Sequence, residues 1–314
     1  MNSKNASLTG VVPPIVTPFT QDGGFYKKGM DNLLEFVIEG GVNGLFALGS
    51  YGGFALMDTA ERKQVAEAIL SRVDGRVPVA IHVGSPATHN SVDLAKHAEA
   101  AGATIVAVVS PFYYGGFAYK EDDFLKHFET IVKAVKVPVW IYNNPKTTGY
   151  RASVDLLKRM ANSGVSGLKD STGDYMYLVE VIREVRKVCP EFSVTAGTAG
   201  LFQALYYQGS DACIAGTANV FPKLLSSLYT ALLSGDHDKA SKLQGIVIAL
   251  RKVQAVRGFR PATCYTLLRM RGIDAGTCRA PWHEPEAEYV KQMRALLNEI
   301  SEVKDLCSGS AELI

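Results

Sequence analysis

The chain alternates between short apolar runs rich in β-branched residues and longer segments in which apolar residues recur with helical spacing. The first pattern is typical of buried strands, and the second is typical of amphipathic helices. The runs that fit strands are residues 11–17, 44–48, 79–83, 104–110, 137–142, 166–169, 193–196 and 212–215.

A helical segment follows each predicted strand. These segments are residues 28–39, 59–73, 91–101, 121–135, 153–162, 175–188, 201–207 and 222–233. Such alternation predicts parallel strands joined by crossover helices, and eight units favour an α/β fold of the (β/α)₈ TIM-barrel type. The sequence has no GxGxxG or GxxxxGK[ST] motif, which would favour a doubly wound nucleotide-binding sheet.

Three more helical segments follow the eighth unit, at residues 237–254, 262–270 and 284–299. We therefore expect a barrel domain over residues 1–235 and a C-terminal helical extension over residues 236–314. The last residues, 308–314, lack periodicity and are expected to fray.

Charge and composition exclude several classes of protein. The 33 basic and 31 acidic residues give a net charge of +2 without a basic stripe, so we expect no nucleic-acid partner. No apolar run is long enough to span a bilayer, and the polar first ten residues lack a signal-peptide core, which predicts a cytoplasmic protein without a membrane partner. The five cysteines form no CxxC pair, which argues against a zinc site.

Active sites of such barrels form where the strands end, which directs attention to Lys169 at the end of the sixth predicted strand. Apolar walls at the barrel mouth would lower the pKa of this lysine and leave a neutral amine. A neutral amine attacks a carbonyl group to form a Schiff base. The alternative is structural, with Lys169 paired to Asp170 or Asp174 in the loop.

Three hydroxyl groups follow neighbouring strands and fit proton transfer beside such an amine. Tyr142 ends the fifth predicted strand, and its phenol fits a general acid and base. Ser50 lies in a glycine-rich turn after the second strand, and Tyr113 follows the fourth. Because hydroxyl groups both donate and accept hydrogen bonds, these residues predict a proton relay to solvent.

Three motifs in this order resemble the dihydrodipicolinate synthase and N-acetylneuraminate lyase superfamily of class I aldolases. The turn Gly-Ser-Tyr-Gly-Gly at 49–53 is similar to the family's GTTGE or GSTGE motif, residues 142–145 match YNxP, and residues 167–171 match the Schiff-base segment. The resemblance covers nearly the whole chain. It implies a TIM-barrel enzyme that needs no cofactor or metal and forms an imine with the 2-oxo acid pyruvate.

By this resemblance, Lys169 is the imine-forming lysine, Tyr142 transfers protons, and Ser50 is the relay hydroxyl. Tyr113 would join the relay from a neighbouring subunit, which implies a homo-oligomer, either a dimer or a tetramer. The backbone of Ser50 and Tyr51 would hold the pyruvate carboxylate. The residues expected to bind substrate are Gly49, Tyr51, Lys146, Thr147, Gly197 and Ile214.

Departures from the family motifs bear on the second substrate. Gly53 replaces the acidic residue of the first motif, and Tyr51 replaces a smaller hydroxy amino acid. Dihydrodipicolinate synthases carry an arginine where Thr147 stands, and Lys146 beside it lacks the bidentate geometry of arginine. Sialate lyases carry acidic residues where residues 197–200 read Gly-Thr-Ala-Gly. The sequence therefore favours a lyase that splits another 4-hydroxy-2-oxo acid into pyruvate and an aldehyde.

Other functions stay open from the sequence. A dihydrodipicolinate synthase acting on pyruvate and aspartate semialdehyde, and a 2-keto-3-deoxy acid dehydratase, would both use the same imine. A non-catalytic binding protein on the same barrel is a further alternative. A metal-dependent site would draw on His82, His89, Asp93 and His97, although their spacing along the chain fits an exposed helix face better than a ligand set.

Overall fold

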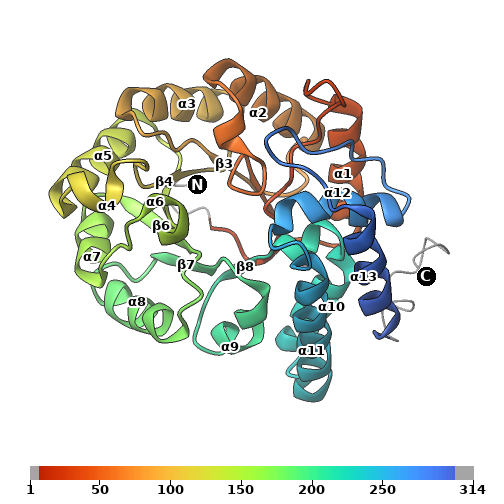
Figure 1. The fold of residues 1–314 in the computed structure, drawn as a ribbon. Coiled ribbons are helices and arrows are strands. Elements are labelled where there is room, and N and C mark those ends of the chain that lie inside the picture. The colour runs from red at the N-terminus through yellow and green to blue at the C-terminus, as the bar shows by residue number, and fades with distance from the viewer. Residues whose placement is uncertain (1–6, 301–314) are drawn as a thin grey trace.

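In the computed structural model, which describes residues 7–300, eight parallel strands form a barrel with the helices outside it (Figure 1). The strands pair in the order β1-β8-β7-β6-β5-β4-β3-β2. They are β1 Gly10–Val12, β2 Leu45–Ala47, β3 Val79–His82, β4 Ile105–Val109, β5 Val139–Asn143, β6 Val165–Asp170, β7 Ser193–Ala196 and β8 Ala212–Ile214. The predicted TIM barrel is confirmed.

The helices around the barrel follow the strands in sequence. They are α1 Lys27–Glu39, α2 Thr59–Val73, α3 Thr88–Ala100, α4 Gly115–Ala118, α5 Glu121–Ala134, α6 Pro145–Thr148, α7 Val154–Asn162, α8 Tyr175–Val188, α9 Phe202–Tyr206 and α10 Pro222–Leu233. Three short 3₁₀ turns lie in loops at the carboxyl ends of strands: η2 Phe54–Leu56, η3 Ala199–Leu201 and η4 Gly216–Asn219. The helix expected at 201–207 therefore begins as the 3₁₀ turn η3.

The barrel closes between its first two strands through a narrow seam. Strand β1 ends at Val12 and not at residue 17, because Pro13 and Pro14 have no N–H group for a strand ladder. A single parallel bridge joins Pro14 to Phe46 of β2. The Phe46 N–H donates to the Pro13 carbonyl at 3.0 Å, and the Ile15 N–H donates to the Phe46 carbonyl at 2.9 Å. These contacts bring the two ends of the sheet together.

Alternate side chains of the strands fill the barrel interior, and the others pack under the helices. The interior cluster consists of Leu8, Val12, Phe46, Ala80, Ile105, Ala107, Val109, Trp140, Tyr142, Ala212 and Ile214. Trp140 is fully buried and lies against β6 at Gly167, where a Cβ atom would come within 2.6 Å of its ring. A glycine is needed at that position for β5 and β6 to pack around this ring.

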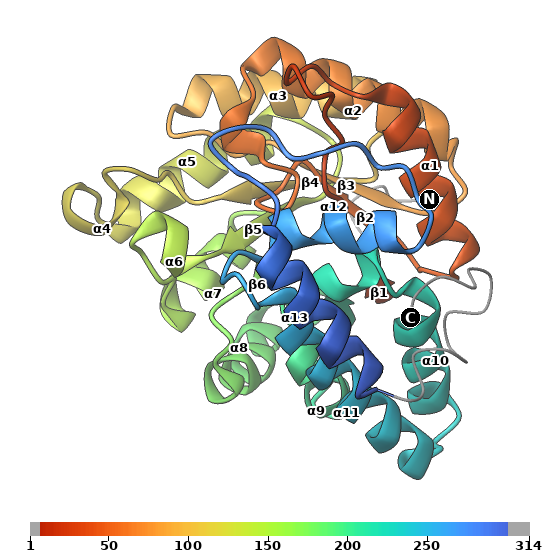
Figure 2. The same cartoon turned by 45° about the vertical axis from the view of Figure 1, so that its right-hand side comes forward.

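The C-terminal extension consists of α11 His237–Gln254, α12 Arg260–Met270 and α13 Ala287–Asn298. Its buried side chains join the core between strands and helices, and the segment between α12 and α13 crosses the barrel toward α2 (Figure 2). Arg279 fastens this segment, donating to the carbonyls of Gly23 and Leu56 and pairing with Glu61 at 2.6 Å. The last helix begins at 287, later than expected, and residues 308–314 lie outside the described residues. The domain boundary at 235 stays a prediction.

Candidate active site

Lys169 lies near the carboxyl end of β6 with its side chain inside the barrel mouth. The residue is 4% exposed, and its Nζ atom is 3.7 Å from the ring centroid of Phe46 and 3.9 Å from that of Tyr142. No carboxylate in residues 7–300 pairs with this amine. Burial lowers the pKa of Lys169 well below its ordinary value, so the neutral amine is favoured.

Asp170 and Asp174, which follow Lys169, bond to groups other than the lysine. Asp170 points away from the barrel interior and accepts a hydrogen bond from the Thr172 N–H at 2.9 Å. Asp174 begins helix α8 and pairs with Arg151 at 3.0 Å. The structural alternative, in which Lys169 pairs with either aspartate, is therefore wrong.

The Tyr142 phenol adjoins the lysine because β5 and β6 pair Tyr142 directly with Lys169. Its hydroxyl lies 3.2 Å from Ser50 Oγ and accepts a hydrogen bond from Asn144 Nδ2 at 3.1 Å. Burial raises the pKa of Tyr142, while hydrogen bonds from Ser50, Ser171 and Asn144 oppose that rise. A neutral amine thus faces a protonated phenol, and this pair can attack a carbonyl group and supply a proton to its oxygen.

The turn that carries Ser50 has free backbone N–H groups. Within this turn, the Gly53 and Phe54 N–H groups donate to the carbonyls of Ser50 and Gly49, each at 3.4 Å. Among the described backbone hydrogen bonds, none uses the N–H groups of Gly49, Ser50 or Tyr51. Unpaired N–H groups of successive residues suit a negatively charged ligand.

The loops after β7 and β8 border the same mouth. The Tyr51 hydroxyl lies so close to Gly216 that a Cβ atom there would be 2.2 Å away. At Gly197, a Cβ atom would be 2.3 Å from the Asp170 carbonyl, so glycine lets this loop close on β6. Ile214 is buried on β8 in the barrel interior. The structure thus brings Tyr51, Gly197 and Ile214 to the end of the barrel that holds Lys169.

Two predicted substrate-binding residues lie farther out, on the short helix α6. Lys146 and Thr147 are exposed, and the Thr147 hydroxyl donates to the Asn144 carbonyl at 3.2 Å. No described interaction joins either residue to Lys169 or Tyr142. Within one chain they belong to the rim of the site.

Tyr113 is not part of the Ser50 and Tyr142 pair within one chain. It follows β4 with φ at 77°, and 79% of its surface is exposed. Its ring contacts Tyr114, which in turn contacts Phe117, and both of these are exposed as well. The hydrogen bond between Ser50 and Tyr142 is therefore present, the Tyr113 side chain is exposed, and the relay stays a prediction.

The sequence did not predict that Phe46 and Asn144 lie near the lysine, and it named His82 only as a candidate metal ligand. Phe46 faces the amine, Asn144 holds the phenol, and His82 lies edge-on to the Tyr142 ring with ring centroids 6.0 Å apart. Asn144 stands within the YNxP motif, which offered a signal. Phe46 lies in an ordinary apolar strand pattern, which offered none.

His82 is a core residue whose ring nitrogens both have hydrogen-bond partners. Its Nδ1 lies 3.0 Å from the Leu48 carbonyl, and its Nε2 accepts the Val109 N–H at 3.2 Å, an arrangement that fits the neutral ring. Burial lowers the pKa of His82 well below its ordinary value. Its hydrogen bonds leave neither ring nitrogen free to bind a metal.

The other residues of the proposed metal cluster pair elsewhere. Asp93 pairs with Lys63 at 2.7 Å, and His97 pairs with Glu67 at 2.8 Å. In the described part of the chain, no group of three or more histidines, cysteines, aspartates and glutamates is placed to hold a metal ion. None of the helices in residues 7–300 has the length and apolar character needed to cross a bilayer.

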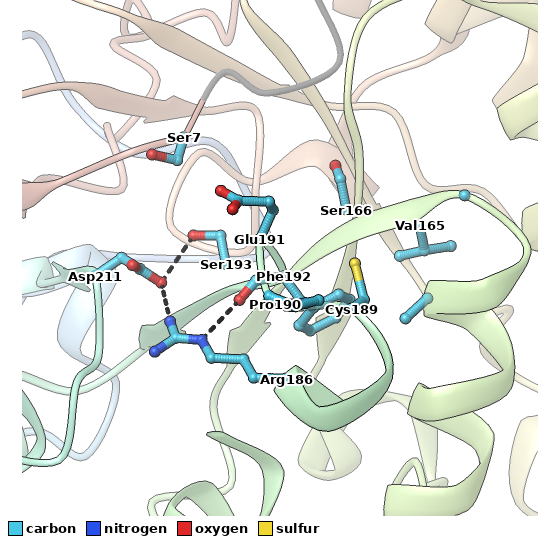
Figure 3. A pocket seen from close by; sticks show the side chains of 12 residues that line it. Ser7, Val165, Ser166, Arg186, Cys189, Pro190, Glu191, Phe192, Ser193 and Asp211 are labelled. Atoms are coloured by element: carbon cyan, nitrogen blue, oxygen red, sulfur yellow. Dashed lines mark hydrogen bonds and ion pairs between the residues drawn. The ribbon is translucent and has the colours of Figure 1, made fainter. Parts of the chain in front are cut away.

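A cavity of about 430 Å³ lies at the opposite end of the barrel, where β6 and β7 begin (Figure 3). Its main charged pair, Arg186 and Asp211, is 2.8 Å apart, and Arg186 also donates to the Phe192 carbonyl at 3.1 Å. Asp211 accepts the Val194 N–H at 2.7 Å as well. These hydrogen bonds and the ion pair hold the loops that lead into β7 and β8, so these groups have a structural role.

Comparison with known proteins decides the family. The sequence profile of the dihydrodipicolinate synthetase family matches residues 7–300. The chain belongs to this family. As a member of the dihydrodipicolinate synthetase family, it is a class I aldolase or lyase, which confirms the resemblance seen in the sequence.

Relatives in this family carry several activities. The chain is 36% identical to a probable 2-dehydro-3-deoxy-D-pentonate aldolase of Escherichia coli, over 79% of this chain and 82% of that protein. It is 30% identical to a 4-hydroxy-tetrahydrodipicolinate synthase of Bartonella quintana, over 91% and 95% of the two chains. The crystal structure of the E. coli prophage protein YagE with pyruvate matches with a TM-score of 0.90 at 29% identity, covering 94% of this chain and 99% of that one.

Proposed function

We propose that this family member is a pyruvate-dependent aldolase that splits a 4-hydroxy-2-oxo acid into pyruvate and an aldehyde, with Lys169 as the imine-forming residue. The observation that carries the proposal is the buried, unpaired amine of Lys169 beside the phenol that Ser50 and Asn144 hold. An unpaired amine in an apolar site is the form of lysine that adds to a carbonyl group.

The reaction begins when Lys169 Nζ adds to the C2 carbonyl of the substrate. Tyr142 gives a proton to the resulting hydroxyl, water leaves, and an iminium ion remains. The Tyr142 phenoxide then takes the proton from the C4 hydroxyl, and the C3–C4 bond breaks to release the aldehyde. The electron pair of that bond moves into the iminium to give an enamine. Protonation at C3 and hydrolysis release pyruvate and restore the amine.

The substrate carboxylate would rest on the free N–H groups of the turn at Gly49, Ser50 and Tyr51. Ile214 offers an apolar wall to the carbon that becomes the pyruvate methyl group, and Gly197 leaves space beside it. Lys146 and Thr147 on the rim would face the aldehyde end of a longer substrate. These roles follow from the positions of the residues around the lysine.

The second candidate is a 4-hydroxy-tetrahydrodipicolinate synthase, the activity named for several relatives of this chain. The exposed Thr147 at the position of the family's arginine speaks against it. A dehydratase would use the same imine. Supplying pyruvate with aspartate semialdehyde, and separately supplying 2-dehydro-3-deoxy sugar acids, distinguishes these activities by the product formed.

A second copy of the chain would complete the site by supplying Tyr113 to the Ser50 hydroxyl. The exposure of Tyr113, Tyr114 and Phe117 supports such a contact, because a single chain leaves this apolar group in water. The oligomer itself, a dimer or a tetramer, stays a prediction, and so does the cytoplasmic location.

Borohydride reduction in the presence of pyruvate tests the proposal directly. We expect a stable pyruvate adduct on Lys169, located by mass spectrometry of peptides. Lys169→Met should abolish the adduct, whereas Lys146→Met, which removes an exposed lysine at the rim, should leave it intact. An absence of adduct on the unaltered protein would reject the imine mechanism.

A further inference from the structure

Two arginines of the C-terminal extension, Arg251 and Arg260, have guanidinium groups without a hydrogen-bond or ion-pair partner among the described residues. Arg251 on α11 reaches the loop after β7, where a Cβ atom on Gly200 would be 3.3 Å from the arginine Nε. Arg260 begins α12, and its Nε is buried without a hydrogen-bond partner. In the described part of the chain, neither guanidinium forms a hydrogen bond or an ion pair.

Both guanidiniums act on the same phenol. Burial raises the pKa of Tyr51, whereas the charges of Arg260 and Arg251 oppose that rise. The pKa of Arg251 is lowered by its burial and then by the positive charge of Arg260. Contacts also connect these groups. The Tyr51 hydroxyl lies against Gly216, and the next residue, Thr217, donates to Gln254, the last residue of α11. Thr263 of α12 donates to the Gln254 carbonyl, so the phenol and the two arginines share one region. Tyr51 directly follows Ser50, which ties this region to the mouth that holds Lys169.

Three other arginines of this extension have carboxylate partners. Arg257 pairs with Glu286 at 3.2 Å, Arg269 pairs with Glu284 at 2.9 Å, and Arg279 pairs with Glu61 at 2.6 Å. Two partly buried guanidiniums that repel each other lower the stability of the protein unless an anion lies between or beside them. The position of the pair beside the site suggests that the substrate brings this anion.

We propose that Arg251 and Arg260, together with the Tyr51 hydroxyl, bind a carboxylate at the far end of the substrate. The aldehyde partner would then be an acid aldehyde, and the 2-oxo acid would carry two carboxylates. Guanidinium groups match carboxylates with paired hydrogen bonds, and the phenol adds a third donor. This assignment rests on the proposed aldolase function and names its substrate class.

The test compares two acceptors of equal chain length in the condensation with pyruvate: succinic semialdehyde, which carries a carboxylate, and butanal, which does not. We expect kcat/KM to favour the acid aldehyde by about 10- to 100-fold, the range of a charge-assisted interaction. Arg251→Gln and Arg260→Gln should each reduce this preference by about tenfold and leave the butanal reaction unchanged. Arg251→Lys, which retains the charge, should keep part of the preference.

Lys252→Gln is the matched control, because this exposed neighbour on α11 carries the same charge and should not alter the preference. Equal use of the two acceptors would overturn the inference, and so would Gln variants that slow both acceptors alike. Borohydride trapping of pyruvate is measured in parallel. Normal trapping without a preference rejects the carboxylate site alone, whereas absent trapping rejects the aldolase function itself.

The two arginines could instead bind a free anion that is not part of the substrate. A thermal unfolding assay with inorganic phosphate distinguishes these two ligands. Stabilisation by phosphate that both Gln variants lose, without any preference between the two aldehydes, would show a separate anion site and overturn the assignment to substrate. Competitive inhibition by phosphate of the succinic semialdehyde reaction, without inhibition of the butanal reaction, supports the proposal.

Discussion

At the scale of single residues, burial shifts the pKa values of Lys169 and Tyr142 in opposite directions. Burial lowers the pKa of the lysine and raises that of the tyrosine, so both groups favour their neutral forms. An amine ready to attack and a phenol ready to give a proton therefore coexist. Exposure of the lysine to water would restore an ammonium ion, which cannot attack a carbonyl group.

The burial of Lys169 has a cost in stability that depends on pH. Its folded pKa lies below the unfolded value, so between the two the unfolded chain binds the extra proton and stability rises with pH. Lys169→Met should be more stable than the unaltered protein at neutral pH, and the difference should shrink toward about pH 10.5 by up to about 1.4 kcal/mol per pH unit. Urea unfolding at several pH values measures this difference.

Lys252→Met, at an exposed position, controls for the loss of a lysine as such. If the difference in the free energy of unfolding between Lys169→Met and the unaltered protein stays constant with pH, burial does not hold the amine neutral.

Asn144 is a positioning residue for the phenol. Its amide donates to the Tyr142 hydroxyl, which leaves the phenol proton free to point toward Ser50. Asn144→Asp replaces this donor with a carboxylate, which should raise the pKa of Tyr142 and reverse the hydrogen bond. We expect kcat to fall about tenfold and the basic limb of the pH–rate profile to move to higher pH. Asn144→Ala removes the donor without adding a charge, so it should lower kcat with a smaller upward movement of that limb, and identical pH–rate profiles for the two variants would contradict the role.

At the scale of elements, strand register explains why the site was largely predictable. Alternation along β5 and β6 places Tyr142 and Lys169 inside the barrel, while Asn143 and Asp170 bond to each other outside it at 2.7 Å. The eight strands were found because apolar runs bounded by helices leave few alternative folds.

What the sequence did not predict depends on contacts between distant segments. The short helices α4 and α6 contain too few residues for any periodicity to emerge. The contact of Phe46 with Lys169 arises only when the sheet curls, and Arg251 and Arg260 follow Tyr51 by some two hundred residues along the chain. Prolines at 13 and 14 do signal an early end to the first strand.

Helix α2 begins with reciprocal hydrogen bonds that offer a test at this scale. The Asp58 side chain accepts the Glu61 N–H at 2.8 Å, and Glu61 accepts the Asp58 N–H at 3.2 Å. Asp58→Ala should lower the free energy of unfolding by about 1 kcal/mol, as loss of an N-cap does elsewhere. Denaturant unfolding measures it. Glu184→Ala, which removes an exposed ion pair with Lys187, should leave stability unchanged, and equal effects of both would contradict a capping role.

At the scale of the whole molecule, the aromatic group after β4 predicts assembly. Light scattering on the purified protein should show more than one chain per particle. Phe117→Asp, which places a charge in this group, should shift the particle toward single chains and lower activity together with assembly. Met176→Asp, at an exposed apolar side chain on α8, should change neither. An active protein that remains a single chain would contradict the contribution of Tyr113 from a neighbour.

The seam between β1 and β2 affects how the protein loses activity on heating. Phe46 supplies the bridge that holds the seam and also the ring that shields the lysine. A parting of the seam by thermal motion would therefore wet the amine at the same moment. Heating should then abolish imine formation before the helices unfold, because Phe46 both bridges the seam and covers the amine.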